Sequence, residues 1–208
     1  MLKKLDTRIR LALIYGSGRE GRFCDKVAGW AISQIEGDGP FELAIIDPGT
    51  LELPPRHVGS GHPALEEVRQ TIAWADGFIV VTPEYNRAYP AILKFLIDSI
   101  GPEWRGKPVG FVSYGGISGG LRAVEQLRLV FGELHAAPIR DGVSFADVWG
   151  RFDTEGRLME ADRAERAMAT MLAQLHWWAS ALRTARETVP YGQFAMEPDP
   201  NSLNQSVR

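Results

Sequence analysis

The sequence contains a single cysteine among 208 residues, so no disulfide can form within the chain. No apolar run approaches the roughly 18 residues of a membrane-spanning helix, and the first ten residues lack the apolar segment of a secretory signal. An excess of positive charge is also missing, because the formal net charge is −3. We therefore expect a reduced, cytoplasmic protein that binds neither membranes nor nucleic acid.

Two common chemical signatures are absent as well. The chain has no Gly-x-x-x-x-Gly-Lys-Ser/Thr motif, which argues against a P-loop nucleotidase. His57 and His62 are five residues apart, which is not the i, i+4 spacing of paired metal ligands on a helix. We predict no metal site.

The stretch LALIYGSGREGRFC, residues 11–24, carries the strongest local signal. Its apolar beginning predicts a buried strand, and the pattern after it predicts a helix. Between them lies a loop with three glycines, which let backbone amides at a helix start approach an anion. Arg19 and Arg22 add charge and Ser17 adds a hydroxyl. The segment therefore predicts a cradle for a terminal phosphate, although a glycine-rich turn with solvated arginines remains the alternative.

The rest of the chain alternates between strand and helix patterns. Further strands are predicted at 42–46, 77–82 and 108–114, with a short fifth one near 136–139 or extending to 145. This pattern is typical of an α/β fold with a doubly wound, five-stranded parallel sheet of order 2-1-3-4-5. We expect one domain over residues 1–186, ending in a helix from about 161, and an extended or mobile tail over 187–208. Ligands of such sheets bind where the first, third and fourth strands end.

The loops at those three strand ends resemble one known family. VTPEYNRAYPAILKFLIDS, residues 81–99, is similar to a signature of the NADPH-dependent FMN reductases, a flavodoxin-like family that includes quinone, azo-dye and chromate reductases. GSGREGRF resembles the phosphate loop of that family, and SYGGISGG resembles its third, glycine-rich flavin loop. One departure is Arg22-Phe23-Cys24, where the family often has a serine or threonine.

The resemblance implies bound FMN, hydride transfer from NADPH to that flavin, and onward transfer to flavin, quinone or another small acceptor. It also implies a homodimer or tetramer. The flavin carries the chemistry, so no protein group is expected to act as acid or base. The implied FMN contacts come from all three loops: Gly16, Ser17, Arg19, Arg22, Phe23 and Cys24; Pro83, Glu84, Tyr85 and Asn86; and Ser113, Tyr114, Gly115, Gly116 and Gly119.

Several alternatives stay open at this point. The protein could be a flavodoxin-like electron carrier, although such carriers usually have a more acidic surface. A Rossmann dehydrogenase is less favoured, because Asp47 lies too far after the glycines to bind a ribose. Glu84 could be a solvated loop residue, and Cys24 could be a small core residue.

Overall fold

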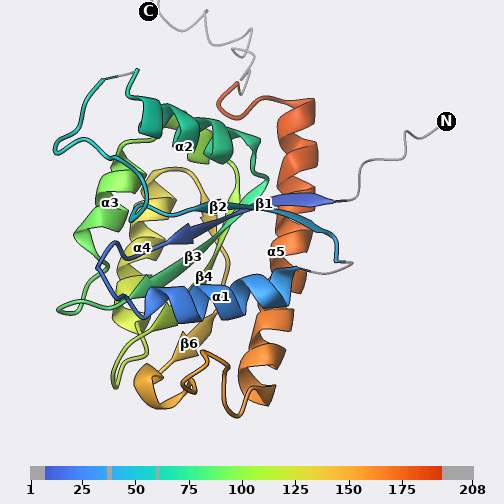
Figure 1. Ribbon diagram of the computed structural model, residues 1–208. Helices are drawn as coiled ribbons and strands as arrows, with labels where there is room; N and C mark the ends of the chain where they lie inside the picture. Colours follow the sequence, from blue (N-terminus) through green and yellow to red (C-terminus); the bar gives the residue numbers. More distant parts are fainter. Residues whose placement is uncertain (1–7, 37–38, 60, 194–208) are drawn as a thin grey trace, which may run out of the picture.

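The computed structural model describes residues 8–36, 39–59 and 61–193 (Figure 1). Its strands are β1 (Ile9–Tyr15), β2 (Phe41–Ile46), β3 (Gly77–Pro83), β4 (Pro108–Tyr114), β5 (Ala137–Pro138) and β6 (Val143–Phe145). Its helices are α1 (Cys24–Ile35), α2 (Pro63–Trp74), α3 (Ala91–Asp98), α4 (Leu121–Glu133) and α5 (Asp162–Thr188), with 3-10 turns η1 (Pro102–Trp104) and η2 (Val148–Gly150). The predicted elements are all present, and most of their bounds differ by one or two residues.

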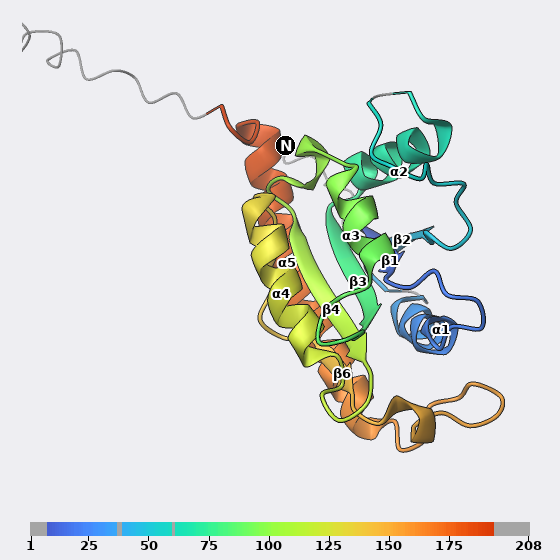
Figure 2. The same ribbon diagram turned by 90° about the vertical axis from the view of Figure 1, so that its left-hand side faces the viewer.

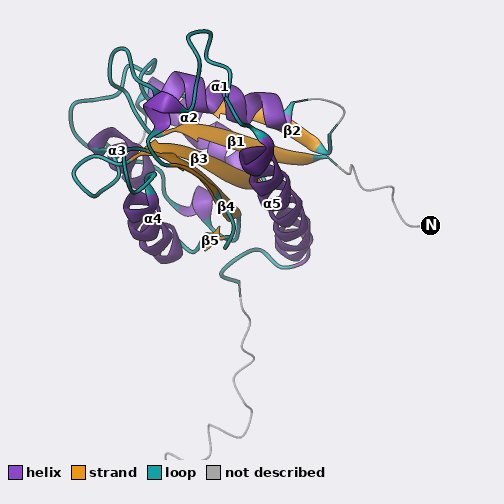
Figure 3. Cartoon of the chain, turned by 90° about the horizontal axis from the view of Figure 1, so that it is seen from below, coloured by secondary structure: helices purple, strands orange, loops and turns teal. Residues whose placement is uncertain are grey.

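The strands form one parallel sheet in the order β2-β1-β3-β4-β5, which confirms the predicted topology. Alternate side chains of the sheet face opposite layers of helices. Leu11 and Leu13 pack with α1 and α5, whereas Ala12 and Ile14 pack with the layer of α2, α3 and α4. Figure 3 shows that helices lie on both sides of the sheet. Every residue of β3 and β4 is buried, as expected for central strands covered on both faces.

The fifth position of the sheet is filled by two short strands. β5 pairs with the beginning of β4 and β6 pairs with its end. Pro138 has no amide hydrogen to continue the first of these ladders. Arg128 of α4 donates hydrogen bonds to the carbonyl oxygens of Ile139 and Arg140 between the two strands, at 2.6 and 2.8 Å. These bonds satisfy backbone acceptors where the ladder is interrupted.

The final helix reaches Thr188, two residues beyond the predicted domain boundary. A turn follows, in which the ring of Tyr191 lies against His135 with 5.7 Å between ring centroids. The predicted tail beyond this turn, residues 194–208, lies outside the described residues. Among the residues described, no helix is both long and apolar enough to cross a membrane.

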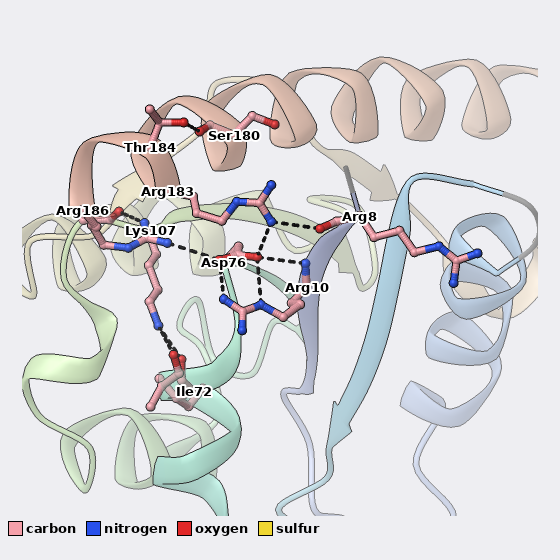
Figure 4. Close-up of polar contacts among 11 residues, drawn as sticks. Arg8, Arg10, Ile72, Asp76, Lys107, Ser180, Arg183, Thr184 and Arg186 are labelled. Carbon is pink, nitrogen blue, oxygen red and sulfur yellow. Dashed lines mark hydrogen bonds and ion pairs between the residues drawn. The ribbon is translucent and has the colours of Figure 1, made fainter. Parts of the chain in front are cut away.

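A buried carboxylate fastens α5 to the amino end of the sheet (Figure 4). The Asp76 side chain is 1% exposed and lies 3.0 Å from Arg10, 3.3 Å from Arg183 and 3.4 Å from Arg186. Burial alone would raise the pKa of Asp76, but the hydrogen bonds from Arg10 outweigh it and keep this pKa below its usual value. Because Arg183 and Arg186 belong to α5, this cluster holds the helix at the sheet edge opposite the predicted ligand loops.

We expect Asp76→Asn to lower the free energy of unfolding by about 3 kcal/mol, because three guanidinium groups lose their shared counter-charge. Asp98→Asn is the matched control: it removes a carboxylate from the half-exposed pair with Lys94 on α3 and should cost less than about 1 kcal/mol. Urea denaturation measures both.

The contribution of Asp76 should also depend on pH. A carboxyl group whose pKa is lowered in the folded protein stabilises the fold at pH values above its unfolded pKa of about 3.9, and this stabilisation is lost as the pH falls through its folded pKa. The difference between wild type and Asp76→Asn should therefore shrink in acid, and equal effects of the two substitutions would contradict this account.

Candidate functional site

The loops after β1, β3 and β4 meet in a cleft of about 530 Å³. Parallel pairing brings the carboxyl ends of these strands to one edge, since Tyr15 pairs with Val81 and Pro83 pairs with Tyr114. Most of the predicted contact residues line this cleft. The lining consists of Arg19, Glu20, Gly21, Arg22, Phe23, Pro83, Glu84, Tyr85, Tyr114, Gly115, Gly116 and Trp149.

The first loop lies close against the end of β3. The amide of Gly16 donates a hydrogen bond of 2.7 Å to the carbonyl oxygen of Val81. A Cβ atom at Gly16 would lie 2.7 Å from the same oxygen, so a larger residue would push the loop away. The fully buried Ser17 hydroxyl lies 2.9 Å from the hydroxyl of Tyr85 and thereby links the first loop to the second.

The two arginines of the first loop have different surroundings. Arg22 donates to both carboxylate oxygens of Asp47, to Asp25 at 2.8 Å and to the carbonyl oxygen of Ser17. These bonds, chiefly those to Asp47, raise its pKa further above its usual value despite partial burial. Arg19 makes no ion pair with any described residue, and its guanidinium lies over the Tyr85 ring, 3.8 Å from the centroid. Arg19 is therefore the loop cation that is free to bind an anion.

Some predicted contact residues lie beneath the cleft instead of lining it. Cys24 is fully buried at the start of α1, and its thiol lies 3.7 Å from the carbonyl oxygen of Val81. Burial raises the pKa of this thiol, so the core interpretation of Cys24 describes its position better than a ligand contact does. Ser113 and Gly119 are also buried, and the Ser113 hydroxyl donates to the Gly119 carbonyl oxygen at 2.8 Å.

The second loop turns sharply at Asn86. Tyr85 and Ala88 exchange backbone hydrogen bonds of 2.8 and 3.0 Å, and both residues between them have positive φ, 50° for Asn86 and 71° for Arg87. Positive φ at both central positions is the pattern of a type I′ turn, in which asparagine is favoured at the first position. Asn86 is exposed and does not line the cleft, so its visible role is to form the turn that presents Tyr85.

Glu84 is the residue that joins the second loop to the third. Its side chain is 7% exposed and accepts hydrogen bonds from the Ser118 hydroxyl at 2.7 Å, the Arg122 amide at 3.1 Å and the Arg122 guanidinium at 2.8 Å. Gly120 precedes α4 and has no side chain to cap it, so Glu84 caps this helix from a distant loop. Burial would raise the pKa of Glu84, but these bonds outweigh it and leave the pKa lowered. The solvated-loop alternative for Glu84 is therefore wrong.

Tyr114 and Trp149 complete the walls of the cleft. The hydroxyl of Tyr114 is buried, and the Cys24 thiol beside it contributes, after burial itself, to raising the pKa of this hydroxyl. Trp149 stands in η2, on a segment of residues 146–161 that extends beyond the sheet towards α1 (Figure 2). Sequence reasoning missed Trp149, because a single aromatic residue in an irregular segment has no period or motif to identify it.

This geometry can be compared with known proteins. Residues 9–150 match the model of the NADPH-dependent FMN reductase family. The chain belongs to this family. An NAD(P)H-dependent FMN reductase of Schizosaccharomyces pombe is 37% identical over 142 residues, which are 64% of this chain and 70% of that relative. A second one, from Pseudomonas aeruginosa, is 32% identical over 182 residues, 84% of this chain and 97% of the relative.

Solved structures agree on the fold. The flavoenzyme FerB of Paracoccus denitrificans, an NAD(P)H:(acceptor) oxidoreductase, superimposes with a TM-score of 0.67 at 21% identity, covering 83% of this chain and 98% of FerB. Family membership makes this chain a flavin oxidoreductase and implies FMN and NAD(P)H as its cofactors. The homodimer or tetramer remains a prediction.

We expect Glu84→Gln to lower the free energy of unfolding by about 1–2 kcal/mol, because Arg122 loses its counter-charge and α4 loses an anionic cap. The matched control is Glu125→Gln, on an exposed carboxylate of the same helix that lies 3.7 Å from Arg128. Its effect should stay within about 0.5 kcal/mol. Thermal or urea unfolding of both variants tests the link between the loops, and no difference between them would disprove it.

Proposed function

We propose that this cleft binds FMN and that the protein oxidises NADPH, passing the electrons to flavin, quinone or another small acceptor. The observation that carries the proposal is Arg19, a cation without an ion-pair partner in a glycine-rich loop between a buried strand and a helix. A phosphate monoester is the group that such a loop and a forked guanidinium bind best. Binding would draw Arg19 away from its position over the Tyr85 ring.

The remaining residues of the cleft fit a flat, heteroaromatic ring. Pro83, Tyr85 and Trp149 offer apolar surface along its walls. The amide of Gly115 is already bonded to the Phe145 carbonyl oxygen at 3.1 Å, whereas the amide of Gly116 bonds to no described residue. The Gly116 amide is therefore a donor available to polar ring atoms.

Bound FMN would supply the chemistry, by accepting a hydride equivalent and later giving it up. The task of the chain is to hold the ring still, with one face open to the donor and then to the acceptor. Donor amides such as that of Gly116 stabilise negative charge without releasing a proton, so they do not titrate. No histidine lines the cleft among the described residues. Because the flavin itself accepts and gives up the hydride equivalent, we expect no protein group to act as acid or base.

The alternative function is a flavodoxin-like electron carrier that binds FMN and does not oxidise NADPH itself. Steady-state NADPH oxidation with and without added FMN separates the two functions. An enzyme turns over many equivalents of NADPH, and a carrier does not. Membership of the reductase family supports the enzyme.

We expect Arg19→Ala to weaken FMN binding by about 1.5–3 kcal/mol, roughly 10-fold to 150-fold in Kd, because a charged hydrogen bond to phosphate is lost. Arg105→Ala is the control. It removes the same charge from an exposed position at the opposite end of the sheet and should leave the Kd unchanged. Flavin fluorescence titration measures both values. An unaltered Kd in Arg19→Ala would remove this residue from the phosphate site.

The kinetics should follow a ping-pong pattern, because one open face of the ring must serve first NADPH and then the acceptor. Double-reciprocal plots should give parallel lines, and turnover should change little between about pH 6 and 8, since no histidine acts as a base. Intersecting lines would show that both substrates bind together. A steep change near the pKa of histidine would reveal a base that the cleft does not display.

A further inference from the structure

A second groove, of about 440 Å³, lies near the proposed flavin cleft. Gly116 lines the cleft and the next residue, Ile117, lines the groove. On the facing segment, Trp149 lines the cleft and Arg151 lines the groove. Since consecutive Cα atoms are about 3.8 Å apart, the groove and the cleft lie next to each other. Its far wall is the beginning of α5, at Arg163, Ala164 and Ala167.

Two cations of this groove are not neutralised. The guanidinium groups of Arg151 and Arg163 form no hydrogen bond and no ion pair with any other residue in the described ranges. Other arginines beside the ligand loops pair with carboxylates, as Arg22 does with Asp47 and Arg122 does with Glu84. Two unpaired guanidinium groups along one groove match a dianionic phosphate, which accepts several charge-assisted hydrogen bonds.

The same groove has an apolar wall. Ile117 is 86% exposed and Leu121 is 54% exposed, although both are large aliphatic residues next to a site of proposed chemistry. Side chains of this kind cover the face of a planar base. The groove therefore combines a surface for a base with two charges for a phosphate, and it lies next to the flavin cleft.

We propose that this groove binds the adenosine 2′-phosphate part of NADPH, with Arg151 and Arg163 on the 2′-phosphate and the adenine against Ile117 and Leu121. The inference rests on the proposed function, because it requires the nicotinamide end to lie over flavin in the adjoining cleft. NADH lacks the 2′-phosphate, so these two arginines would give the enzyme its preference for NADPH. Arg19 serves the phosphate of FMN and takes no part in this choice.

The direct test is calorimetric titration of the full-length, FMN-loaded protein with adenosine 2′,5′-bisphosphate and, separately, with adenosine 5′-monophosphate. We expect the bisphosphate to bind at least about 10-fold more tightly, the effect of one or more charged hydrogen bonds. The double variant Arg151→Ala/Arg163→Ala should lose this difference. Arg105→Ala should keep it, and Arg151→Lys/Arg163→Lys should restore part of it, since lysine keeps the charge without the fork.

Kinetics of the same variants separate this inference from the proposed function. The double alanine variant should raise the KM for NADPH by about 10-fold to 100-fold and leave the KM for NADH within about 2-fold. Equal binding of both nucleotides to the wild type, or an unchanged NADPH KM in the variant, would overturn the role of the groove while flavin reduction stands. If the bisphosphate binds in an arginine-dependent way but the protein oxidises neither NADPH nor NADH, the inference about the groove stands and the proposed reductase function is wrong.

Discussion

The functional edge of this protein depends on the parallel register of three strands. β1, β3 and β4 end side by side, so loops that are distant in sequence begin within a few ångströms of one another. Gly16 permits the closest approach, because a side chain there would meet the carbonyl oxygen of Val81. Ser17 then joins the first loop to Tyr85, and Glu84 joins the second loop to the start of α4. The cleft is thus held by hydrogen bonds between loops as well as by the sheet.

The arginines discussed above differ in whether they contact a carboxylate. Arg22, Arg122 and the arginines around Asp76 each contact a carboxylate, and most of them fasten segments that are far apart in the chain. Arg19, Arg151 and Arg163 have no such carboxylate among the described residues, and they line two neighbouring depressions. Because an unpaired guanidinium beside a cleft is free to meet an incoming anion, these three residues are the strongest candidates for phosphate contacts.

Much of this arrangement could be predicted from the sequence, because apolar runs, glycine-rich turns and helical periodicity are local patterns. The strand order and the meeting of the three loops follow from those patterns together with the rules of doubly wound sheets. What could not be predicted depends on contacts across the fold. Arg22 pairs with Asp47, 25 residues away, and Glu84 lies buried where α4 begins. Trp149 likewise reaches the cleft from an irregular segment.

The central claim is that this edge of the sheet holds FMN in a position where a nicotinamide can reduce it. The most direct measurement is an anaerobic titration of the FMN-loaded protein with NADPH, followed by visible absorption. The account predicts that FMN stays with the protein through gel filtration, or through dialysis against FMN at a concentration near its Kd. It also predicts that one equivalent of NADPH bleaches the absorption bands of the oxidised flavin. A protein that gains no flavin spectrum, or one whose bound flavin stays oxidised in excess NADPH, would contradict it.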